Sequence, residues 1–215
     1  HLSNFICSLR PNEDKLCFSA VFEIDEYANV LNEWFGRTII NSQRRFTYEE
    51  AQKVIETGKG DMQDEILILD QLAKKMREQR FARGAMAFDR VEVKFHLDEK
   101  ARPTGIYFKE SKDSNKLIEE FMLLANKRVA MFIEKEKTKR KTFVYRVHDE
   151  PNPDKLKSLA YFIKRFGYKL TARSKSQAAS SINNLLQEVK GSKESNIIET
   201  LAIRTMAKAE YTTKN

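Results

Sequence analysis

The order in which strand-like and helix-like segments follow one another constrains the fold of this chain most. Apolar and polar residues alternate over residues 17–25, and residues 34–41 also have the pattern of a strand. The later segments mix both types: helices over 47–57, 62–83, 113–135, 152–166, 178–189 and 195–209, and strands over 88–97, 104–109 and 142–148. Because strands and helices do not alternate regularly, a doubly wound parallel sheet is disfavoured. The order predicts an α+β fold with a mixed, mostly antiparallel sheet and surrounding helices.

Local signals mark the ends of two of these helices. The sequence Thr47-Tyr-Glu-Glu50 is a capping box, in which Thr47 caps the helix and Glu50 reaches back to it. Gly58 follows the expected last turn of that helix, as glycine does where a helix ends. Asn152 precedes Pro153, and a cap residue followed by proline predicts a second helix start.

Composition indicates an ordinary globular protein. The chain has 215 residues, 41% of them hydrophobic and 33% charged, which is enough for one sizeable core or two small ones. No apolar run approaches the ~18 residues of a membrane span, and no secretion signal opens the chain. We therefore expect a cytoplasmic protein with no membrane contact. Cys7 and Cys17 match no zinc or redox spacing, so buried, reduced thiols are expected.

Charge is distributed unevenly along the chain. Residues 1–70 contain 7 Lys/Arg and 13 Asp/Glu, whereas residues 71–215 contain 32 and 18. A basic second part favours a polyanionic partner, although a solvated, lysine-rich surface explains the same counts. Generic motifs add no enzyme class, because the sequence has no phosphate-binding glycine loop, no HExxH and no GxSxG.

Six blocks of the sequence change this interpretation. In order along the chain, they resemble the conserved blocks of the ribonuclease II/ribonuclease R family, with ribonuclease R the more similar subfamily. The blocks and their family patterns are residues 2–20 (LSN…CSL.P..D.L), 45–51 (R-[LF]-[TS]-Y), 84–88 (GGI.F), 115–126 (..LIEE.M.LAN), 146–151 (RIHD.P) and 201–209 (LLRSM..A).

The resemblance implies a 3′→5′ exoribonuclease that hydrolyses single-stranded RNA to nucleoside monophosphates with two Mg²⁺ ions. Two blocks of the family are missing: the D-x5-D-x-DDA aspartate cluster that holds the metals, and the HFTSPIRRY block that supplies an arginine. The cold-shock and S1-type RNA-binding domains are also missing. We therefore expect residues 1–215 to be the central part of an RNB-type catalytic domain, inactive alone, with no metal ligand. The alternative is a non-catalytic basic RNA-binding or interaction module on the same fold.

The resemblance also implies roles for individual residues. Tyr48 matches the tyrosine that packs on the 3′-terminal nucleotide, although a tyrosine at a helix start can also pack locally. Phe88 matches a phenylalanine that wedges between bases, with a place in the core as the alternative. Glu119 matches the active-site glutamate near the terminal ribose, where a carboxylate can accept a hydrogen bond from the 2′-OH. The adjacent Glu120 remains an alternative.

Four further residues fall within matched blocks and could contact phosphates: Arg45, Arg146, His148 and Arg204. Each of them can equally serve in a structural ion pair or hydrogen bond.

Overall fold

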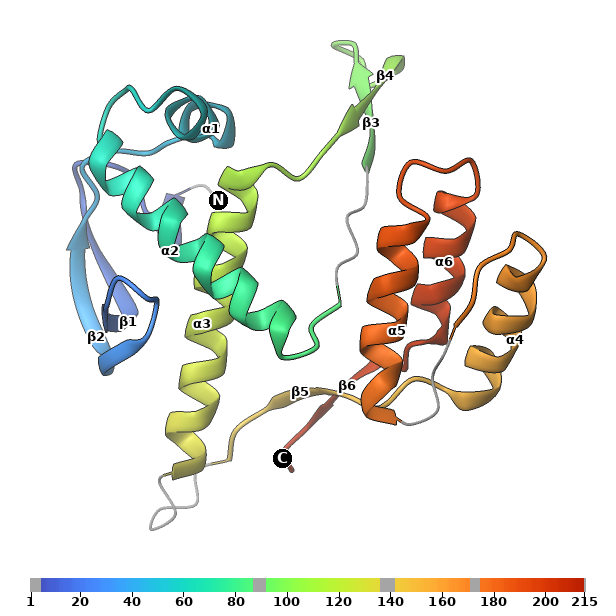
Figure 1. Cartoon of the computed structure of the whole chain (residues 1–215). Coiled ribbons are helices and arrows are strands. Elements are labelled where there is room, and N and C mark those ends of the chain that lie inside the picture. The colour runs from blue at the N-terminus through green and yellow to red at the C-terminus, as the bar shows by residue number, and fades with distance from the viewer. Residues whose placement is uncertain (1–4, 87–91, 136–141, 171–174, 215) are drawn as a thin grey trace. The chain divides into compact units, whose positions relative to one another are not determined.

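The computed structural model describes residues 5–86, 92–135, 142–170 and 175–214. The chain forms two compact units (Figure 1). The first, unit 1, comprises His1–Glu78 and Arg90–Lys135, and the second, unit 2, comprises Gln79–Asp89 and Glu136–Asn215.

Unit 1 begins with a long antiparallel pair, β1 (Asp14–Ile24) and β2 (Val30–Asn41). The turn between them is held by the side chain of Asp25, whose carboxylate accepts hydrogen bonds from the backbone N–H groups of Tyr27 and Asn29. Aspartate suits such turns because its short side chain reaches backbone donors two residues on. The predicted strands are confirmed, and both extend further toward the N-terminus than the alternation indicated.

Three helices accompany this pair: α1 (Tyr48–Thr57), α2 (Gln63–Ala82) and α3 (Asp113–Lys135). The ring of Phe35 on β2 lies 5.0 Å from that of Phe132 on α3, and Arg128 of α3 pairs with Glu33 of β2. The start of α3 is joined to α1 by a hydrogen bond of 2.9 Å from the Ser114 N–H to the Gln52 side chain. The hairpin and α1 are therefore both fixed to α3.

A second hairpin in unit 1 consists of β3 (Glu92–Leu97) and β4 (Pro103–Lys109). Their register places five apolar side chains on one face, and each of them is more than half exposed: Val93, Phe95, Leu97, Ile106 and Phe108.

Unit 2 contains α4 (Pro153–Lys164), α5 (Lys175–Glu188), α6 (Ser195–Thr205) and the antiparallel pair β5 (Tyr145–His148) and β6 (Ala209–Thr212). The three helices lie side by side (Figure 1) and enclose one apolar cluster. Its buried members are Leu159, Ile163, Ile182, Leu185, Leu186, Val189, Ile198 and Ala202.

Three predictions need correction. The helix predicted over 195–209 ends at Thr205, because Met206 is extended (φ −71°, ψ 143°) and residues 209–212 pair with β5 instead. The antiparallel α+β class is confirmed, but the described strands form three separate two-stranded sheets and no larger one. The prediction of buried thiols is wrong for Cys7, which is exposed in the segment before β1, while Cys17 is half-buried in that strand.

None of the described helices combines the length and the apolar character needed to cross a membrane.

Candidate nucleic-acid interface

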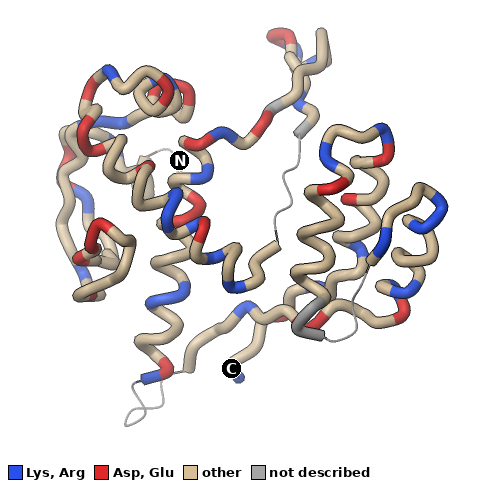
Figure 2. The backbone as a smooth tube through the Cα atoms, viewed as in Figure 1, with Lys and Arg blue, Asp and Glu red and all other residues tan. Residues whose placement is uncertain are grey.

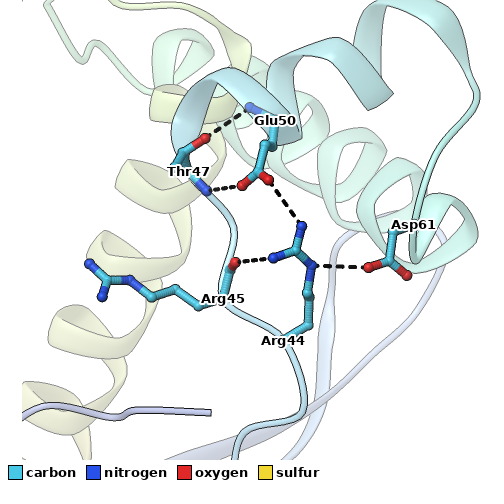
Figure 3. A network of polar contacts seen from close by, with 5 residues as sticks. All are labelled: Arg44, Arg45, Thr47, Glu50 and Asp61. Atoms are coloured by element: carbon cyan, nitrogen blue, oxygen red, sulfur yellow. Dashed lines mark hydrogen bonds and ion pairs between the residues drawn. The ribbon is translucent and has the colours of Figure 1, made fainter.

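The start of α1 is built by a polar network around Arg44 (Figure 3). The Arg44 guanidinium donates to Asp61 Oδ2 at 3.0 Å, to Glu50 Oε1 at 3.0 Å and to the Arg45 carbonyl at 2.8 Å. It also lies over the Phe46 ring, 4.6 Å from its centroid. Arg44 thus joins the segment before α1 to the helix itself and to the loop after it.

The predicted capping box is present in full. The Thr47 hydroxyl accepts from the Glu50 N–H at 3.1 Å, and Glu50 Oε2 accepts from the Thr47 N–H at 2.8 Å. The Thr47 N–H and the Arg44 guanidinium hold the pKa of Glu50 below its usual value. Gly58 ends the helix in the left-handed conformation (φ 66°), which glycine adopts without steric cost. Both ends of α1 are therefore defined locally.

Tyr48 and Arg45 flank this cap. Tyr48 is the first residue of α1 and 43% exposed, so its ring presents surface outside the core. Arg45 is exposed, and Figure 3 shows its side chain directed away from the network that its carbonyl joins. Among the described residues the Arg45 side chain makes no ion pair. Of the two neighbouring arginines, Arg44 is thus the one that is paired with carboxylates.

The two candidate glutamates on α3 differ sharply in exposure. The Glu120 side chain is 3% exposed and lies 3.6 Å from Arg77, whereas the Glu119 side chain is 50% exposed and lies 3.9 Å from the same guanidinium. Because Arg77 projects from α2, the Arg77–Glu120 pair joins α2 to α3. Glu120 thus has a structural position, and Glu119 is the glutamate that a ligand can reach.

In unit 2, Arg146 and His148 lie two residues apart on β5, and both are exposed. Arg146 lies opposite Tyr211 of β6, which is 75% exposed, so a cation and an aromatic ring are neighbours on this pair of strands. Nδ1 of His148 lies 3.4 Å from the Ala207 carbonyl oxygen.

Arg204 lines a groove of about 720 Å³ between α4 and α6. Apolar side chains, including Phe162 and Leu201, form part of its lining. Two further cations, Lys155 and Lys208, line it as well, and no carboxylate does. Within the described part of the chain, none of these three cations forms an ion pair. The sequence resemblance pointed to Arg204 alone, because neither lysine carries a family pattern.

Two expectations from the sequence concern Phe88 and the metal ligands. Phe88 falls outside the described residues. No group of three or more His, Cys, Asp or Glu within the described ranges could hold a metal ion.

Comparison with known proteins places the chain in a family. The RNB domain family matches residues 1–215. A DIS3-like exonuclease 2 from Schizosaccharomyces pombe is 33% identical over 96% of this chain and 24% of its own length. An inactive exonuclease DIS3L2 from Arabidopsis thaliana is 31% identical over 98% of this chain and 21% of its own length.

Among solved structures, Mycoplasma genitalium RNase R in complex with ribose-methylated single-stranded RNA superposes with a TM-score of 0.84. It is 26% identical and covers 99% of this chain and 34% of that one. The chain thus spans about a fifth to a third of the length of such relatives. The match over all 215 residues, with the same fold, shows that this chain belongs to the RNB domain family.

Proposed function

We propose that this chain is the RNA-holding part of a hydrolytic 3′→5′ exoribonuclease that releases nucleoside monophosphates. The observation that carries the proposal is the RNB match over the whole chain. Tyr48, which matches a family residue, is exposed at the start of a helix with a complete capping box. RNase R from Mycoplasma genitalium was solved in complex with ribose-methylated single-stranded RNA and with double-stranded RNA, which supports RNA as the ligand. Single-stranded RNA is the form proposed here.

Tyr48 is proposed to stack on the 3′-terminal nucleotide. An aromatic face suits an enzyme that degrades any sequence, because every base offers a π-face and such stacking is worth about 1–3 kcal/mol per base. Phe88 is proposed as a second aromatic contact, on the family match alone.

Glu119 is proposed to accept a hydrogen bond from the ribose 2′-OH, a group that DNA lacks. Both glutamates lie near Arg77, but the Glu119 side chain is 50% exposed and accessible, whereas the Glu120 side chain is buried. Four further residues are proposed to contact RNA phosphates, since each presents an exposed side chain: Arg45 in unit 1, and Arg146, His148 and Arg204 in unit 2.

Hydrolysis is proposed to require Mg²⁺ held by an aspartate cluster that these residues do not contain. When bound, the two ions would activate a water and stabilise the leaving oxygen. The 215-residue chain supplies no such cluster among its described residues, so we expect it to bind RNA without hydrolysing it. Efficient metal-dependent degradation by the purified chain would contradict this assignment.

The test uses a longer form of the protein that contains the expected aspartate cluster and arginine block. Single-stranded RNA labelled at the 5′ end is incubated with Mg²⁺ and the products are sized on a gel. We expect stepwise shortening from the 3′ end, with a longer final product for Tyr48→Ala.

Tyr161→Ala is the matched control, because Tyr161 is also an exposed helix tyrosine, 76% exposed on α4. An unchanged final product for Tyr48→Ala would remove Tyr48 from the site.

A non-catalytic RNA-binding module is the second candidate. It is favoured by the inactive exonuclease DIS3L2 from Arabidopsis thaliana. That relative is 31% identical to this chain, close to the 33% of the DIS3-like exonuclease 2 from Schizosaccharomyces pombe. RNA binding by the longer protein with no shortening at any Mg²⁺ concentration would select this candidate.

A further inference from the structure

Arg44 and Arg45 are neighbours in the sequence but have opposite surroundings. All three nitrogens of the Arg44 guanidinium donate to protein oxygens, on Arg45, Glu50 and Asp61. Three of its five N–H donors are thus occupied by protein oxygens. These partners all belong to the segment that carries Tyr48, so Arg44 is placed to order that segment.

We propose that Arg44 is a positioning residue that fixes Tyr48 and Arg45 in the geometry required to hold the 3′-terminal nucleotide. This inference rests on the proposed function and extends it to a residue outside the family-matched block.

The coupling from Arg44 to Tyr48 runs through Glu50. One carboxylate oxygen of Glu50 accepts from Arg44 at 3.0 Å, and the other accepts from the Thr47 N–H at 2.8 Å. Thr47 is the residue directly before Tyr48. By holding Glu50 in this orientation, Arg44 completes the cap that sets where α1 begins and how its first side chain leaves the backbone.

A second connection joins the other end of α1. Asp61 lies in the loop after the helix, and its carboxylate accepts from Arg44 Nε at 3.0 Å. Together with the bond to the Arg45 carbonyl, this holds the segment from 44 to 61 as one closed loop (Figure 3). Ordering this loop before RNA binds reduces the conformational entropy that binding would otherwise cost.

Arg44 also neutralises two carboxylates beside the proposed site. If the guanidinium were removed, Glu50 and Asp61 would repel an RNA phosphate, so charge and geometry must be separated. Arg44→Lys keeps the charge but loses the planar fork that reaches several acceptors at once, whereas Arg44→Gln loses both.

The experiment measures binding of 5′-fluorescein single-stranded RNA to the 215-residue chain by anisotropy. The variants form a cycle: Arg44→Gln, Tyr48→Ala and the double substitution. We expect Arg44→Gln to weaken binding by roughly three- to tenfold in the unsubstituted chain and by clearly less beside Tyr48→Ala, because coupled residues are not additive. The RNA affinity of Arg44→Lys should be close to that of Arg44→Gln.

A salt titration separates positioning from phosphate contact. Loss of a direct contact lowers the slope of log K against log salt by about one. We expect that change for Arg45→Gln and an unchanged slope for Arg44→Gln. Arg37→Gln, which removes an exposed arginine of β2 in the same unit, is the charge control and should leave the affinity within twofold.

Additive effects of Arg44→Gln and Tyr48→Ala, full rescue by Arg44→Lys, or a lowered salt slope for Arg44→Gln would each overturn the positioning role. If Tyr48→Ala weakens binding and Arg44→Gln does not, only this inference fails. If the unsubstituted chain does not bind RNA, or Tyr48→Ala has no effect, the proposed function itself fails. Amide hydrogen exchange of Thr47 and Tyr48 gives an RNA-independent check, and unchanged exchange in Arg44→Gln would overturn the inference as well.

Discussion

The two units hold their candidate residues by different means. In unit 2 the exposed cations sit on elements around a closed apolar cluster, where Ile163, Ile182 and Ile198 are fully buried. In unit 1 the start of α1 and the α2–α3 contact depend on polar groups, including Arg44 and the Arg77–Glu120 pair. Apolar packing thus fixes the second unit, and directional hydrogen bonds and ion pairs fix the candidate site of the first.

The apolar side chains of unit 1 reinforce this difference. Leu16 and Phe18 on β1 are 87% and 75% exposed, and the whole apolar face of the β3–β4 hairpin is open. A two-stranded hairpin has marginal stability in water unless another layer covers it. Figure 2 marks acidic positions along the turns and helices of residues 1–70, where Asp and Glu outnumber Lys and Arg. Unit 1 should therefore be less stable than unit 2 and more sensitive to single polar changes.

The largest expected effect comes from the core of unit 2. Ile198→Ala should lower its free energy of unfolding by about 2–5 kcal/mol, because it leaves a cavity in a fully packed cluster. The control is Ile197→Ala, whose side chain is 49% exposed and whose loss should cost far less.

Two probes resolve which unit is affected. Urea unfolding is followed by far-UV circular dichroism and by fluorescence of Trp34, the single tryptophan, which lies on β2 in unit 1. A destabilised helical transition with an unchanged Trp34 transition is expected. If both transitions shifted to lower urea concentration together, the two units would unfold as one, and the difference in stability between them would be disproved.

The two glutamates of α3 give the next effect, inside unit 1. Glu120→Gln should destabilise the fold by about 1–3 kcal/mol, because it removes the charge of a buried group that pairs with Arg77. Glu119→Gln should change stability by less than about 0.5 kcal/mol, since its side chain is half exposed.

Function should show the opposite pattern. Affinities for RNA and DNA oligonucleotides of one sequence are compared for each variant. Glu119→Gln should reduce the preference for RNA, and Glu120→Gln should preserve it wherever the protein is folded. If Glu120→Gln alone reduced the preference, the 2′-OH contact would belong to Glu120.

The sequence predicted local structure well where the signal was itself local. Thr47, Glu50 and Gly58 define α1 by contacts within a few residues, and those contacts are present. The strand β6 was missed because it depends on pairing with β5, some sixty residues earlier, and the same segment continues a helical pattern. Periodicity reports the preference of a segment and carries no information about a distant partner.

The same limit applies to the candidate site. Arg44 and Arg45 cannot be told apart by residue type, and what distinguishes them is the place of Asp61 after the helix. Glu119 and Glu120 are adjacent residues of one type, and only the three-dimensional structure shows that Glu120 is buried and Glu119 half exposed. The family patterns indicated where the site lies along the chain, but not which of two adjacent side chains faces outward.

The smallest effect on stability is expected at the cations of unit 2. Arg204→Ala should change the free energy of unfolding by less than about 0.5 kcal/mol, because its exposed side chain has no ion-pair partner among the described residues. It should nevertheless weaken RNA binding and lower the salt slope by about one, as expected for the loss of one phosphate contact.

Lys193→Ala is the matched control for Arg204→Ala, because Lys193 is an exposed cation of unit 2 outside the α4–α6 groove. Equal losses of affinity in both variants would mean that unit 2 attracts RNA through its overall charge alone. A loss confined to Arg204→Ala would instead make the groove a specific contact. The two units would then share one task by different physical means, with stacking on a polar-capped helix in unit 1 and phosphate binding on a packed helical core in unit 2.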